Sequence, residues 1–169
     1  RVFWRSGVRL SMTDSHEAEF VSGILRIKAA QRIEMKVVRP DVTLLSSLSN
    51  TWPPALLDMK PGDLVLVFDI RRYEHEIETL NRIAAERGMH TILFTDRWKS
   101  PVAKTATVVF SVETEVPSAW DSSVVTLFVV EALIEALQNS IWKTTRDRMR
   151  DLEGLLEKSQ LFRKPRVLL

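Results

Sequence analysis

The clearest hydrophobic pattern lies between Leu64 and Thr95. Leu64 to Phe68 form an uninterrupted apolar run after a Pro-Gly-Asp sequence, which is typical of a strand covered on both faces. From Tyr73 the apolar residues recur at helical spacing, Gly88 suits a left-handed helix end, and Thr91–Thr95 is again apolar and β-prone. The pattern predicts a strand-helix-strand unit with parallel strands and a right-handed crossover.

A second, less regular unit of this kind is expected nearer the start. Arg1–Trp4 has the composition of a strand, residues 5–11 that of a polar loop, and a helix with an apolar face follows before Ile33–Val38 returns to strand. Pro53 and Pro54 favour a short helix that begins at Ala55. Together with a further strand at Thr107–Val112, this order predicts a mostly parallel sheet between helices.

Residues 120–141 predict a long helix that is apolar around most of its circumference. Such a helix is either buried inside its own domain or paired with another subunit, and both interpretations can hold together. The following residues, 142–169, carry eight Lys or Arg against four Asp or Glu and keep an apolar stripe at helical spacing. A solvated amphipathic helix is the simpler interpretation of this extension, and a nucleic-acid-contacting tail is the alternative.

Composition narrows the functional classes. At 169 residues with 45% hydrophobic content, the chain is expected to form one globular domain. The absence of cysteine excludes disulfides, Cys-ligated zinc and a thiol nucleophile, and a formal charge of +2 does not by itself indicate a nucleic-acid binder. No apolar run reaches 18 residues, so we expect a soluble, cytoplasmic protein without contact to a membrane. Because the sequence begins at Arg1 without a methionine, we expect it to be a piece of a longer chain.

Polar residues follow two of the predicted strands, where ligands bind in an open α/β sheet. The second of these loops contains Asp69, Arg71, Arg72 and Tyr73, and the first contains Ser6, Gly7, Arg9 and Ser11. Helix-start amides, hydroxyls and guanidinium groups favour an anion, so a phosphorylated or carboxylated small molecule is the expected ligand. The alternative is that each arginine pairs with a nearby carboxylate such as Asp69, Glu74 or Glu76.

No sequence pattern indicates a metal or cofactor. The three histidines, His16, His75 and His90, lack the spacing of a metal site, and there is no dinucleotide, P-loop or nucleophile-elbow motif. We therefore expect no cofactor and no bound metal.

The order of motifs resembles the SIS domain, the sugar-isomerase and phosphosugar-binding module. The resemblance rests on GDLVLVFD, ETLNRIAAERGMHTILFTD, the KSPVAKTA of residues 99–106, TVVFSV, and the AWDSS of residues 119–123 ahead of the long helix. This last arrangement looks most like the ligand-sensing half of RpiR-type bacterial transcription regulators. The resemblance implies a three-layer α/β/α fold with a five-stranded parallel sheet over residues 1–141, extended by helix in 142–169. It further implies a homodimer, a sugar-phosphate ligand between the first and second loops that Ser122 would also contact, and a DNA-binding domain ahead of residue 1.

Both phosphate loops depart from the family pattern. The usual Ser-x-Ser-Gly of the second loop, followed by Ser or Thr, is replaced by Asp69 to Tyr73, and the usual Gly-x-Gly-x-Ser of the first is replaced by Trp4 to Ser11. Two explanations compete. The arginines either take over the binding of an anion or close the site by pairing with an internal aspartate.

Three functions follow from these patterns. The leading expectation is a non-enzymatic, ligand-sensing and dimerising domain of a transcription regulator. An aldose-ketose phosphate isomerase is the second, with His16 and Glu17 as the only acid/base pair near the first loop. The third is a degenerate SIS domain that serves only for assembly.

Overall fold

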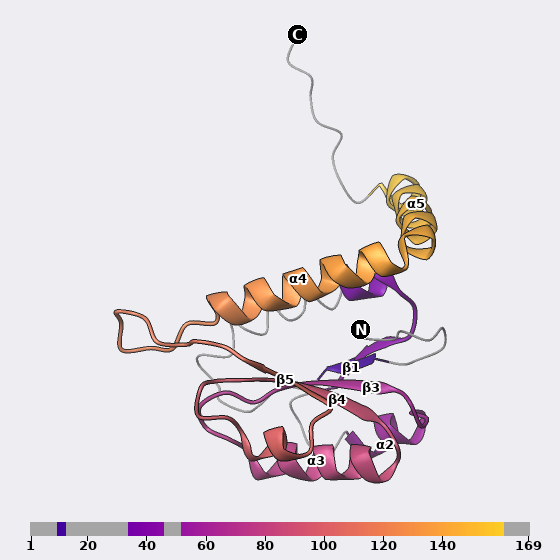
Figure 1. The fold of residues 1–169 in the computed structure, drawn as a ribbon. Helices are drawn as coiled ribbons and strands as arrows, with labels where there is room; N and C mark the ends of the chain where they lie inside the picture. Colours follow the sequence, from indigo (N-terminus) through magenta and orange to yellow (C-terminus); the bar gives the residue numbers. More distant parts are fainter. Residues whose placement is uncertain (1–9, 13–33, 46–51, 161–169) are drawn as a thin grey trace.

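The fold is a parallel five-stranded sheet between two layers of helices (Figure 1). This computed structural model describes residues 10–12, 34–45 and 52–160. The strand order is β2-β1-β3-β4-β5, and every neighbouring pair is parallel. The strands are β1 (Leu10–Met12), β2 (Val42–Leu44), β3 (Leu64–Phe68), β4 (His90–Thr95) and β5 (Val108–Ser111). This arrangement confirms the predicted α/β class with its parallel sheet.

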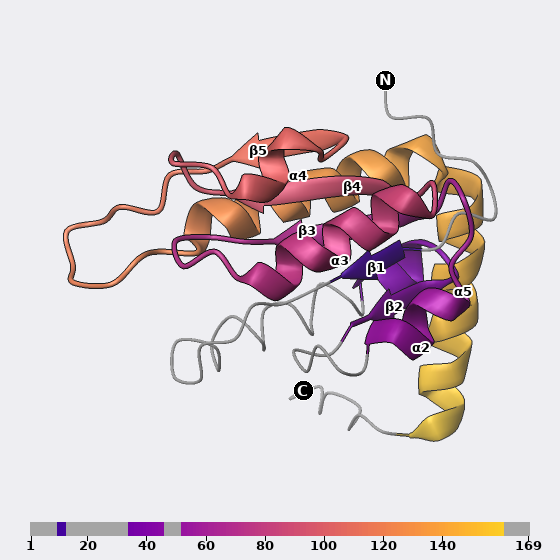
Figure 2. The ribbon, with the colours of Figure 1, turned by 90° about the horizontal axis from the view of Figure 1, so that it is seen from below.

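The helices lie on both faces of the sheet. On one face lie α2 (Trp52–Leu57) and α3 (His75–Glu86), and on the other lies α4 (Val124–Ser140), as Figures 1 and 2 show. The short 3-10 helix η2 (Pro101–Lys104) connects β4 to β5, and α5 (Trp142–Ser159) follows α4 at an angle of 103°. None of the described helices could span a membrane alone, and only the bent pair of α4 and α5 is long and apolar enough when both are counted together.

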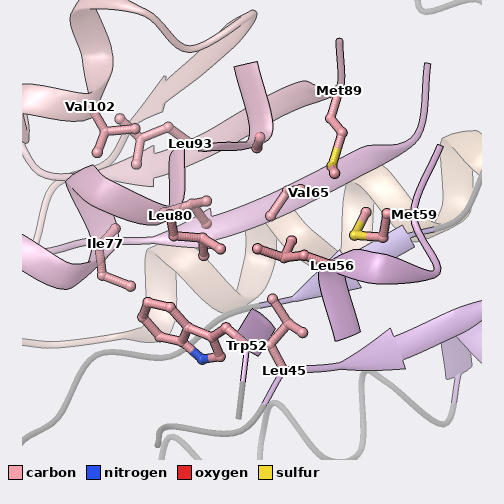
Figure 3. Close-up of a cluster of buried hydrophobic side chains, with 12 residues drawn as sticks. Leu45, Trp52, Leu56, Met59, Val65, Ile77, Leu80, Met89, Leu93 and Val102 are labelled. Atoms are coloured by element: carbon pink, nitrogen blue, oxygen red, sulfur yellow. The ribbon is translucent and has the colours of Figure 1, made fainter. Parts of the chain in front are cut away.

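Strand β3 connects the two hydrophobic cores. All five of its residues are buried, and because successive side chains alternate in direction, they divide between the two faces. Leu64, Leu66 and Phe68 pack in the core beneath α4, while Val65 and Val67 pack in the core beneath α3, which Figure 3 shows. The continuous apolar run of the sequence therefore reflects burial on both sides.

Helix α3 forms as its apolar spacing predicts. Ile77, Leu80 and Ala84 are buried on its inner face, and the helix is followed by Gly88 at a φ of 73°. The Gly88 carbonyl accepts a hydrogen bond from the Gly62 amide at 2.8 Å, which joins the two turns that precede β3 and β4.

Two predictions for the start of the chain are wrong. Residues 34–38 form a helix instead of a strand: Met35 and Val38, three positions apart, are both buried, and strand β2 begins only at Val42. A short apolar run of this length fits either structure, and here the helical spacing is the one that buries both side chains. Leu10 and Ser11 belong to a strand instead of a polar loop. The strand predicted at residues 1–4 and the helix that follows the loop lie outside the described residues.

The long C-terminal helices are confirmed through residue 159. Helix α4 buries one stripe against the sheet, formed by Thr126, Val130, Ile134 and Leu137, so it is not enclosed on all sides. Helix α5 is largely exposed, as a solvated amphipathic helix should be. Its Thr145 and Arg148 side chains donate hydrogen bonds to the carbonyls of Val38 and Val37 at 3.1 and 3.0 Å, which fix α5 to the end of the 34–38 helix.

Candidate functional site

The polar groups at the carboxyl edge of the sheet converge on Asp96, the first residue after β4. Asp96 is fully buried, and its Oδ2 accepts the Arg71 amide at 2.7 Å. Its Oδ1 accepts the Tyr73 hydroxyl at 2.5 Å and the amides of Trp98 and Lys99 at 3.1 and 3.2 Å. A buried carboxylate with four donors is well satisfied, and it fixes the loop after β3 against the loop after β4.

Arg71 occupies the middle of the loop after β3. Its φ of 70° is in the left-handed region, which costs a non-glycine residue roughly 1–2 kcal/mol, and its hydrogen bond to Asp96 stabilises this conformation. The side chain turns away from the buried aspartates: its Nε donates to both carboxylate oxygens of Asp121, at 2.9 and 2.8 Å, and its guanidinium lies 4.4 Å from the Trp98 ring centroid. Arg71 is therefore paired internally, with a partner other than the carboxylates expected from the sequence.

A second arginine lies on the same tryptophan. The Arg97 guanidinium is 4.3 Å from the Trp98 ring centroid, and its Nη2 forms a 2.6 Å ion pair with Glu115. Both Glu115 and Asp121 belong to the connection between β5 and α4, residues 112–123, which extends outward from the carboxyl edge of the sheet in Figure 1. Two stacked arginines thus contact this connection at two points.

Asp69 lies directly behind this cluster. It is 1% exposed, and one carboxylate oxygen accepts the Ser100 hydroxyl, which connects β3 to the start of η2. The other oxygen, Oδ1, is buried and makes no hydrogen bond within the described residues. Burial raises the pKa of the Asp69 carboxyl, while the Ser100 hydroxyl and the Glu74 amide act in the opposite direction. Asp69 is thus a structural carboxylate at an electrostatic cost.

The remaining predicted residues of the second loop have different surroundings. Arg72 is exposed, and its amide donates to the Ile70 carbonyl at 3.0 Å. Tyr73 contributes its hydroxyl to Asp96, and burial together with this hydrogen bond raises the pKa of that hydroxyl, so it stays a donor at neutral pH. The Ser122 hydroxyl oxygen accepts the Val124 amide at 3.3 Å and so caps the start of α4.

The predicted first loop is wrong in register. Ser11 is in the middle of β1, paired with Thr43 and Val65, and Ser6, Gly7 and Arg9 lie outside the described residues. In the sequence these three residues precede β1, so they cannot belong to the loop that follows its carboxyl end. That loop starts at residue 13, which also lies outside the described part, as do His16 and Glu17.

Four residues of this site were missed by the sequence analysis: Asp96, Arg97, Trp98 and Asp121. Asp96 and its neighbours directly follow a predicted strand, so the same edge-of-sheet rule that selected Asp69 applied to them as well. Asp121 carried no such signal, because it is 50 residues from Arg71 in the sequence and only the path of the connection brings the two together.

The net character of the edge favours anion binding at one point only. The start of α3 carries Glu74, Glu76 and Glu78 and has no side-chain cap, which disfavours an anion at its amides. The stacked arginines present the positive charge instead. Within the described residues, the terminal nitrogens of Arg71 donate no hydrogen bond, since its contact with Asp121 uses Nε alone.

Comparisons with known proteins agree with this architecture. Residues 43–136 match the SIS domain. The fold is similar to the sugar isomerase domain of the RpiR transcription factor from Sphaerobacter thermophilus, with a TM-score of 0.74 and 20% identity over 86% of this chain and 78% of that one. It is also similar to Vibrio vulnificus NanR complexed with ManNAc-6P, with a TM-score of 0.69 and 13% identity over 92% of this chain and 58% of the NanR chain.

A third similar structure is an Escherichia coli protein in complex with a sugar phosphate, with a TM-score of 0.65 and 19% identity over 87% of this chain and 77% of that one. Comparison of the sequence with curated proteins gave no significant match.

Proposed function

We propose a function from the premise that this chain belongs to the SIS domain family, which the match over residues 43–136, more than half of its length, establishes. The protein is the ligand-sensing and dimerising domain of an RpiR-type transcription regulator. It binds a small anionic metabolite, of the sugar-phosphate class, at the carboxyl edge of the sheet and does not transform it.

The observation that carries this proposal is the placement of Arg71. It stands where the family's phosphate loop holds a serine, its strained backbone is fixed by the buried Asp96, and its terminal guanidinium nitrogens are available within the described residues. A guanidinium with two adjacent N–H donors matches a phosphate or carboxylate in shape and charge. The similar folds of an RpiR regulator and of NanR, whose structure contains ManNAc-6P, support both the regulatory role and the ligand class.

Thermal unfolding of the whole chain with a panel of phosphorylated and carboxylated metabolites tests the ligand. At about 100 times its Kd, a bound metabolite should stabilise the fold by about 2.7 kcal/mol, which corresponds to a rise in Tm of about 5–10 °C. Arg71→Ala should lose this rise. Arg82→Ala is the matched control, because Arg82 is an exposed arginine of α3 whose ion pair with Glu86 lies away from the site. If no metabolite in the panel raises Tm, the domain serves assembly alone, as the internal Arg71–Asp121 pair would permit.

The regulatory role has a separate test in the full-length gene product. A DNA-binding domain should precede residue 1 there, and the full-length protein should bind a DNA fragment from its own promoter region with an affinity that the metabolite changes. A catalytic or transport domain in that position would contradict the regulator proposal. Turnover of a sugar phosphate by the isolated chain in a coupled isomerase assay would contradict the non-enzymatic part.

A further inference from the structure

The connection between β5 and α4 is held by two carboxylates at its two ends. Glu115, near its start, pairs with Arg97, and Asp121, near its end, pairs with Arg71. The Ser122 amide also donates to the Thr114 carbonyl at 2.8 Å, so the two ends of the connection are joined to each other. We call Arg71, Arg97, Trp98, Glu115 and Asp121 the arginine clasp.

The cationic half of the clasp is preorganised by buried groups. Asp96 accepts the amides of both Arg71 and Trp98, so a single buried carboxylate sets the position of an arginine and of the ring on which it stacks. Each guanidinium lies within 4.4 Å of the ring centroid, and the two cations are therefore close enough to be bridged by one small molecule. Like charges held this close favour a ligand that neutralises both.

The anionic half of the clasp is replaceable. The side chains of Arg71, Arg97 and Glu115 are about half exposed, and that of Asp121 is 28% exposed, so solvent and solutes reach both ion pairs. Exposed pairs of this kind are weak, and a free anion of higher charge can displace them. Only one nitrogen of each arginine is engaged by its carboxylate, which leaves further donors on both.

We propose that Arg71, Arg97 and Trp98 form the binding site for a metabolite with two anionic groups, and that Glu115 and Asp121 occupy the two arginines until it arrives. This inference rests on the proposed function and adds its regulation. Entry of the ligand displaces both carboxylates at once and releases the connection of residues 112–123. Because this connection leads into α4, whose first turn carries the exposed Val124 and Val125, ligand binding alters the surface presented there.

Hydrogen-deuterium exchange of the whole chain tests the clasp without any ligand. The double variant Glu115→Gln/Asp121→Asn removes both negative charges with little change in size. Peptides that cover residues 112–123 should then exchange about fivefold faster or more, which is the effect expected from losing two exposed ion pairs. Glu86→Gln removes one exposed ion pair of α3 and serves as the control, with no change in these peptides. Unchanged exchange in the double variant would overturn the proposal.

Pyrophosphate, a small molecule with two linked anionic groups, serves as the ligand probe. It should accelerate exchange of the same peptides in the wild-type chain, and it should bind the double variant about tenfold or more tightly, because no internal carboxylate competes for the arginines. Arg97→Gln should abolish the response. Faster exchange in the double variant without any binding of pyrophosphate would overturn the ligand assignment.

A further outcome separates this inference from the proposed function. If a metabolite of the panel stabilises the chain in an Arg71-dependent way that Arg97→Gln leaves unchanged, the two-arginine site is wrong, whereas the proposed effector domain stands. If no metabolite stabilises the chain, the proposed function fails, while the exchange measurement still decides whether the clasp holds the connection.

Discussion

At the scale of single residues, two buried aspartates at one sheet edge have opposite electrostatic situations. Asp96 accepts four hydrogen bonds, whereas Asp69 accepts the Ser100 hydroxyl and has an oxygen that is buried without a hydrogen bond to the described residues. A buried carboxylate that is incompletely satisfied is costly when charged, which is why burial raises the pKa of Asp69. Asp69 should therefore favour folding more when it is protonated.

This cost predicts a pH dependence that Asp69→Asn should remove. Below about pH 4 the aspartate is protonated in both states. As the pH rises past that value, the unfolded chain releases its proton first, so the wild-type free energy of unfolding falls until the raised folded-state pKa is passed. The asparagine variant escapes this fall. Urea denaturation between pH 4 and pH 8 should show its stability increasing relative to wild type as the pH rises; a constant or shrinking difference would contradict the prediction.

Sequence reasoning at this scale located the edge but not the partners. Asp69, Arg71 and Tyr73 were selected because residues that follow a strand face the ligand side, and all three lie at that edge. The sequence left open whether Arg71 would bind a ligand or pair internally, and the structure shows the pair with Asp121. That partner is set by the course of residues 112–123, which contain no periodic pattern from which a path could be predicted.

At the scale of elements, the accuracy of sequence reasoning followed the strength of each pattern. The unit from β3 through β4 was predicted nearly to the residue, because a continuous buried strand, a helical stripe and Gly88 all indicate the same structure. Residues 33–38 were misassigned because six apolar or alternating residues satisfy both helical and strand spacing. In β1, a strand of three residues is too short for any periodicity to show.

The glycines give a matched pair of substitutions at this scale. Gly88 has a φ of 73°, and an added Cβ would lie 3.3 Å from the Pro61 Cβ, so Gly88→Ala should lower the free energy of unfolding by about 1–2 kcal/mol. Gly154 lies inside α5 with nothing within 4 Å of an added Cβ, so Gly154→Ala should raise it by about 0.4–1 kcal/mol. Urea denaturation of both variants checks the pair, and a loss of stability in Gly154→Ala would show that α5 is not helical at that point.

At the scale of the whole molecule, α4 combines two roles that the sequence left open. Its buried stripe closes the core over β3 and β4. Its N-terminal half also exposes Val124, Val125 and Phe128, with exposed fractions of 67%, 40% and 69%. Exposed apolar side chains that cluster on one helix indicate an interaction surface, since scattered ones need no explanation but a contiguous patch does. This surface supports the proposed homodimer.

The dimer proposal makes Phe128 its most sensitive residue. Placing a charge at the centre of an apolar interface leaves that charge desolvated and unpaired, so Phe128→Glu should weaken self-association by about 100-fold or more, or 2–3 kcal/mol. Asn139→Glu, at an exposed position near the other end of the same helix, is the control and should not change it. Sedimentation velocity at several concentrations measures the effect, and circular dichroism confirms that both variants are folded. Because Phe128 points away from the core, the variant should keep the wild-type midpoint of urea unfolding at concentrations where the wild type is monomeric. A Phe128→Glu chain that sediments as the wild type does would place the partner surface elsewhere than on α4.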